Sequence, residues 1–237
     1  MYKNLELLNK NKHEALCIDE LTNYKFAKEL TYTPIGLSEI IKISSSLPIF
    51  IAGGDKNEFI TIMSMMDDTN YFYDKTYANS TYIPNSLRIY PFLMVNLNDE
   101  KNTKAFSIEI DADCLGTDKT HKLFNNGEIE NQHVKNKMNL TMYFDADLEK
   151  SADLIKELKE HDLLIKKEFK IKISENQSKQ ILSNSYIVDH KKLMSLDDSI
   201  LIKWLRNGWM TIIDYHLNSI INIEKLIDKA LEAKKNK

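Results

Sequence analysis

Residues 186–226 constrain the fold most, because they predict a strand, a capped helix, a glycine stop and a second long helix in succession. Ser195 and Asp198 have the spacing of a helix-capping pair, and Gly208 ends the helix that follows them. Apolar residues then recur three or four positions apart through residues 209–231. We therefore expect a C-terminal pair of helices, each with one buried side.

Runs of β-branched, aromatic and alternating residues predict strands in the rest of the chain. Residues 48–52 and 58–65 flank Gly53 and Gly54, which is typical of a hairpin, and both faces of the second run are apolar, as in a central strand. Further strands are expected at residues 70–74, at 88–96 with Pro91 at the start or at a sheet edge, at 105–111, at 169–173 and at 180–188.

An amphipathic helix is expected at residues 147–160, and the polar residues 117–139 favour a long surface loop or a loosely held helix. The chain contains no linker rich in serine, glycine or proline. We therefore predict a single domain, residues 1–237, of the α+β class. Its mostly antiparallel sheet would pack against the 147–160 helix and the C-terminal helix pair.

The charge and the apolar pattern exclude several classes of function. A net charge of -3 gives no broad attraction to nucleic acid or to anionic lipid. No apolar run is long enough to span a membrane, and the charged N-terminal residues do not form a signal peptide, so we expect a cytoplasmic protein. Cys17 and Cys114 are far apart and are expected to be reduced packing residues.

Local motifs for catalysis or cofactor binding give no site. Asp111, Asp113 and Gly116 begin like a calcium loop, but Leu115 and Lys122 occupy positions where that loop needs oxygen ligands. The six histidines have no metal-ligand spacing, and His216 is interpreted as a core or rim residue. We therefore assign no catalytic residues, no metal and no cofactor. Residues brought together from distant positions are an alternative that one sequence leaves open.

Four residues are the candidates for binding a partner: Tyr82, Arg88, Tyr90 and Trp209. Arginine can form two parallel hydrogen bonds to a carboxylate, and aromatic rings supply rigid contact area. The alternative is structural: Arg88 would pair with an internal acid, the tyrosines would fill the edge of the core, and Trp209 would pack inside it.

Several blocks of residues resemble the SapC family of bacterial proteins. The blocks are Lys12-His13 with Leu16, Tyr24 with Phe26-Ala27-Lys28, Pro48-Ile49-Phe50, Tyr82-Ile83-Pro84, Arg88 with Tyr90-Pro91-Phe92, Leu123-Phe124 with Gly127, residues 186–189, Leu193, Leu196, Gly208, Tyr215-His216-Leu217, Ser219 and Leu226. The family pattern has a second arginine where this chain has Ile89, so the resemblance leaves Arg88 as a single cation here.

The resemblance implies a role in the production or export of a surface-layer protein. We expect a cytoplasmic accessory protein, not an enzyme, that binds a polypeptide cargo or a protein of the export machinery, with no nucleic acid as partner and no membrane span. An enzyme that modifies a peptide or an envelope precursor through a non-local active site is the alternative. A self-assembling structural protein, which would need complementary apolar surfaces, is a third.

Overall fold

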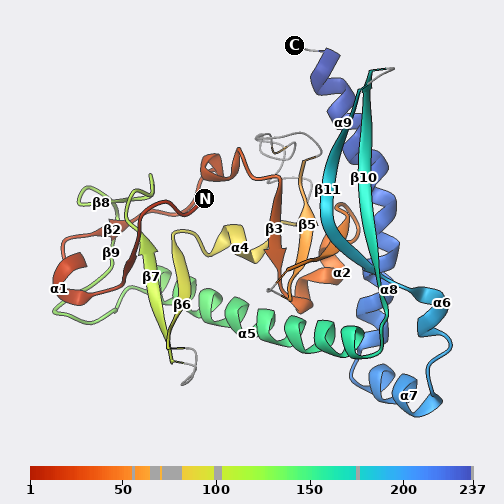
Figure 1. Cartoon of the computed structure of the whole chain (residues 1–237). Coiled ribbons are helices and arrows are strands. Elements are labelled where there is room, and N and C mark those ends of the chain that lie inside the picture. The colour runs from red at the N-terminus through yellow and green to blue at the C-terminus, as the bar shows by residue number, and fades with distance from the viewer. Residues whose placement is uncertain (55–56, 65–69, 71–81, 99–102, 175–176, 236–237) are drawn as a thin grey trace. The chain divides into compact units, whose positions relative to one another are not determined.

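The computed structural model describes residues 1–54, 57–64, 70, 82–98, 103–174 and 177–235 (Figure 1). The chain divides into two compact units, which are described separately below. Unit 1 consists of residues 1–27 and 85–146, and unit 2 consists of residues 28–84 and 147–237. The single domain expected from the sequence stays a prediction, which this division does not test.

The described part of unit 1 contains two small antiparallel sheets, with strand orders β1-β7-β6 and β8-β2-β9. Their strands are β1 (Leu5–Leu7), β2 (Cys17–Ile18), β6 (Phe92–Asn98), β7 (Thr103–Glu109), β8 (Leu115–Gly116) and β9 (His121–Lys122). The short helices are α1 (Lys10–His13), η1 (Lys25–Ala27) and α4 (Asn85–Arg88). Ile18, Phe92, Ile108 and Leu123 lie in one buried apolar cluster, so both sheets contribute to one core.

Unit 2 contains a five-stranded antiparallel sheet within its described residues, in the order β10-β11-β4-β5-β3. Its strands are β3 (Tyr32–Ile35), β4 (Ile49–Ala52), β5 (Phe59–Ile62), β10 (Leu164–Ser174) and β11 (Gln177–Val188). The β4–β5 hairpin and the central place of β5 confirm the sequence prediction, and the side chains of β5 are buried along its whole length. Helices accompany the sheet: η2 (Leu37–Glu39), α2 (Ile40–Ile43), α6 (His190–Leu193), α7 (Asp198–Arg206), α8 (Trp209–Ser219), η3 (Ile220–Asn222) and α9 (Ile223–Lys235).

The C-terminal helices bind the sheet through buried polar side chains as well as apolar ones. His216 of α8 is fully buried, and its Nε2 accepts a hydrogen bond from the backbone N–H of Val188 at 3.3 Å. The hydroxyl of Ser219 accepts a hydrogen bond from the backbone N–H of Ile49 at 2.9 Å and donates to the carbonyl of His216. These bonds join α8 to both β11 and β4.

The helix expected at residues 147–160 is the second half of the 29-residue helix α5 (Gln132–Glu160). Of the two alternatives expected over residues 117–139, the helix is the one observed from residue 132 onwards, although buried residues hold it in place. Buried residues recur every three or four positions in the first half of α5, but Lys137 and Thr141 are among them, beside Val134 and Phe144. Because half of these buried residues are polar, the sequence lacks the regular apolar repeat from which an amphipathic helix is predicted.

Of three further local predictions, one is confirmed, one needed correction and one lies mostly outside the described residues. The strand expected within residues 88–96, with Pro91 at its start, is β6, which begins at Phe92, and residues 85–88 before it form α4. The N-cap residue of α7 is Asp197, whose side chain makes no capping hydrogen bond, and the hydroxyl of Ser195 donates instead to the carbonyl of Lys192. The strand expected at 70–74 falls mostly on residues that the structure does not describe.

The fold is α+β with antiparallel sheets and a C-terminal helix pair, as the sequence predicts. Gly208 has a φ of +77° and separates α7 from α8, which confirms the glycine stop.

Candidate functional site

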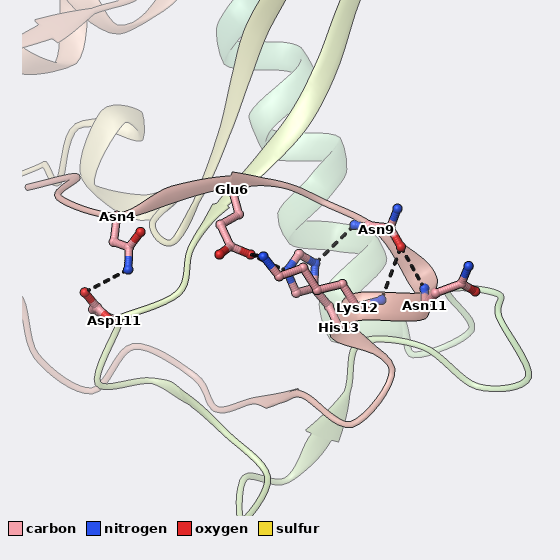
Figure 2. A network of polar contacts seen from close by, with 7 residues as sticks. All are labelled: Asn4, Glu6, Asn9, Asn11, Lys12, His13 and Asp111. Carbon is pink, nitrogen blue, oxygen red and sulfur yellow. Dashed lines mark hydrogen bonds and ion pairs between the residues drawn. The ribbon is translucent and has the colours of Figure 1, made fainter.

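The first polar network of unit 1 lies around His13 and is drawn in Figure 2. His13 is only 2% exposed, and its Nδ1 accepts a hydrogen bond from the backbone N–H of Asn9 at 3.1 Å. Its Nε2 lies 3.0 Å from Glu6 Oε2, and Lys12 Nζ lies 2.6 Å from the same oxygen. Hydrogen bonds from Lys12 and then His13 lower the pKa of Glu6. Because both ring nitrogens of His13 are occupied, this network fastens α1 to β1 and has no nitrogen left for a substrate.

Arg88 presents a different arrangement at the last residue of α4. Its side chain is exposed, and Nη1 donates a hydrogen bond to Oδ1 of the buried Asn85 at 3.0 Å. Within the described part of the chain, Arg88 forms no ion pair with a carboxylate. The structural alternative, an internal acid as the partner of Arg88, is therefore not what the described residues show. The guanidinium is positioned by one amide and keeps further donors for a ligand.

An aromatic row lies next to Arg88. Tyr90 is 5% exposed and stacks on Phe26 with ring centroids 3.9 Å apart, and Phe26 contacts the half-buried Tyr24 edge to face at 5.8 Å. Burial raises the pKa of Tyr24, and the positive charge of Arg88 opposes that rise. Tyr24 is thus the ring that lies near Arg88 and is still partly exposed, whereas Tyr90 packs in the core of unit 1.

Lys137 of α5 is a second cation near Arg88. It is only 8% exposed, and its ammonium donates to the backbone carbonyl of Arg88 at 3.2 Å. No carboxylate forms an ion pair with Lys137 among the residues described. Burial lowers the pKa of Lys137 to about 8; the nearby charge of Arg88 acts in the same direction, and Cys114 and Glu20 act against it. The exposed guanidinium of Arg88 is therefore the cation that can reach a carboxylate ligand, and Lys137 holds the backbone behind it.

Sequence reasoning missed Tyr24 and Lys137 as members of this site. Tyr24 is one of the residues that carry the family resemblance, but nothing in the sequence places it beside Arg88. Lys137 lies in the stretch that was expected to be a surface loop or a loosely held helix, where a lysine is ordinarily solvated. We call Tyr24, Arg88 and Lys137 the Arg88 site.

The other two predicted partner-binding residues, Tyr82 and Trp209, belong to unit 2 and lie in different surroundings. Tyr82 is half-buried, and the ammonium of Lys42 lies 5.3 Å from the centre of its ring. Trp209 is partly exposed, contacts Trp204 edge to face at 5.9 Å, and has the ammonium of Lys203 6.0 Å from its ring. Partner binding by these two residues, and by Arg88 and Tyr90, stays a prediction.

The described residues contain no group of three or more histidine, cysteine, aspartate or glutamate side chains placed to hold a metal ion. In the loop that begins like a calcium site, Asp111 accepts a hydrogen bond from Asn4 (Figure 2). Leu115 and Gly116 of the same loop form β8. None of the helices that the structure describes has the length and apolar character needed to cross a lipid bilayer.

A family model described as SapC matches residues 8–226, which includes most of both units and all four predicted partner-binding residues. No curated protein and no solved structure matches the chain. A match over this share of the sequence shows the family, and the chain belongs to the SapC family.

Proposed function

We propose that this protein is a cytoplasmic accessory protein that binds a polypeptide partner during the production or export of a surface-layer protein. The family match supports the link to the surface layer, because the resemblance implies that role. The partner would be the exported polypeptide itself or a protein of the export machinery.

The observation that carries the binding part of the proposal is the exposed Arg88 without an acidic partner in the described residues. Asn85 holds its guanidinium, which reduces the entropy lost when a ligand binds. The partly exposed ring of Tyr24 supplies apolar contact area next to that charge. A carboxylate of the partner, from an acidic side chain or from a chain terminus, is the group that this arrangement fits.

The test is a pull-down from lysate of cells that make a surface layer, with three purified baits compared. The baits are the wild-type protein, Arg88→Ala, and Lys135→Ala as a matched control. Lys135 is an exposed cation on α5 of the same unit, so its loss changes the net charge equally. Circular dichroism and thermal unfolding of each bait confirm that all three are folded.

We expect the wild-type and Lys135→Ala baits to enrich the same surface-layer precursor or export component. Arg88→Ala should reduce that enrichment about tenfold or more, because truncating an arginine that binds a carboxylate costs on the order of 2 kcal/mol. Enrichment that is equal for all three baits would remove Arg88 from the binding site. A wild-type bait that enriches no such protein would contradict the proposed function.

A further inference from the structure

Helix α7 is apolar on two opposite faces, and in unit 2 only one of them is covered. Trp204 is fully buried against Trp209 of α8, and its indole N–H donates to Glu157. On the other face Ile202 is 49% exposed and Leu205 is 65% exposed. Two large aliphatic side chains on the outer face of α7 are therefore exposed to solvent in unit 2.

The charges on this outer face are arranged so that the helix is complementary to itself. Asp198, Ile202 and Arg206 are four residues apart, so they form one ridge along α7, and all three are exposed. The ridge is about 12 Å long, with a carboxylate at one end, a guanidinium at the other and Ile202 at its midpoint. Neither charge forms an ion pair with any other described residue.

We propose that α7 is a self-association site, on which the α7 helix of a second copy of this chain packs antiparallel across a two-fold axis. Antiparallel packing about Ile202 places Asp198 of each copy opposite Arg206 of the other. The same contact covers Ile202 and Leu205 on both copies. A two-fold interface brings the same patch of both copies together, so the patch must be complementary to itself. This ridge is self-complementary in the antiparallel arrangement.

Two other occupants fit the ridge less well. An anionic membrane surface would attract Arg206 and repel Asp198 at the other end of the same ridge. An unrelated helix would need its own acid and base at matching positions, which the second copy supplies by symmetry. One face of a nine-residue helix is small compared with the roughly 800 Å² per partner of a stable dimer, so the association is weak and depends on concentration.

The experiment uses charge reversal in the full-length chain and sedimentation velocity over roughly a hundredfold range of concentration. Asp198→Lys alone places two cations opposite each other at both ends of the pair, and Arg206→Glu alone places two carboxylates there. Each single variant should therefore remain monomeric where the wild-type protein associates. Mixed in equal amounts, the two variants restore both opposite-charge pairs, so the mixture should contain a heterodimer. The double variant should associate as the wild-type protein does.

Asp228→Lys is the matched control, because it makes the same charge change at an exposed position of α9, outside the ridge, and should leave association unchanged. Circular dichroism and tryptophan fluorescence show whether each variant retains α7 packed through Trp204. A wild-type chain that stays monomeric at the highest concentration would overturn the proposal. Single variants that associate as the wild-type protein does, or a mixture that behaves as the separate variants do, would overturn it equally.

Discussion

The stability of unit 2 should fall in weak acid because of one buried imidazole. His216 is fully buried, and burial lowers its pKa to about 4 from the ordinary value of about 6.5. Its Nε2 accepts the N–H of Val188, and no described residue forms a hydrogen bond of normal geometry with its buried Nδ1. Protonation would turn Nε2 from an acceptor into a donor that faces the N–H of Val188. The resulting positive charge would be buried where water cannot solvate it.

The sign and the size of the effect follow from these two pKa values. In the unfolded chain His216 binds a proton below about pH 6.5, whereas in the folded protein it stays neutral down to about pH 4. The neutral imidazole therefore contributes its full stabilisation above pH 6.5, and that contribution is lost as the pH falls to 4. Each pKa unit is worth about 1.4 kcal/mol, so the loss amounts to about 3 kcal/mol.

Urea unfolding at a series of pH values, followed by tryptophan fluorescence, measures this loss. Both tryptophans of the chain, Trp204 and Trp209, belong to unit 2, so their signal reports the unit that contains His216. Carboxylates also titrate in this range, and His216→Gln serves as the reference because glutamine keeps an acceptor for Val188 but does not titrate. Between pH 7 and pH 4 the wild-type free energy of unfolding should fall by about 3 kcal/mol more than that of His216→Gln. Parallel curves for the two proteins would refute the reasoning.

Substitutions at two further positions test local features of unit 2. Gly208→Ala places a Cβ at a φ of +77° with no atom within 4 Å of it, so any effect on stability comes from backbone strain alone. We expect the free energy of unfolding in urea to fall by about 1 kcal/mol, and an unchanged stability would contradict this prediction. The buried carboxylate of Asp147 accepts hydrogen bonds from the N–H of Ser38 at 3.0 Å and from its hydroxyl at 2.7 Å. Asp147→Ala should lower the free energy of unfolding by about 1 to 3 kcal/mol, and Asp147→Asn should lower it clearly less because asparagine keeps an acceptor. Equal losses for the two variants would show that these hydrogen bonds are not the cause.

The sequence determined the features that depend on neighbouring residues. The β4–β5 hairpin follows from two apolar runs around Gly53 and Gly54, and the end of α7 follows from Gly208, because a positive φ costs a glycine little. The pairing of β10 with β11 follows from two alternating runs with a polar turn between them. Each of these features depends only on residues that are close together in the sequence, so the sequence is sufficient to predict it.

Features that depend on distant contacts could be decided only by the tertiary structure. The sequence left residues 132–139 open between a loop and a helix, because packing inside unit 1 buries Lys137, a residue that local patterns assign to solvent. Tyr90 appeared equivalent to Arg88 as a contact residue, but stacking on Phe26 buries the tyrosine and leaves the arginine exposed. Charge and polarity in a sequence state what a side chain prefers. Folding brings distant segments together, and their contacts decide which polar side chains are buried. The same contacts decide which charges stay exposed for a partner.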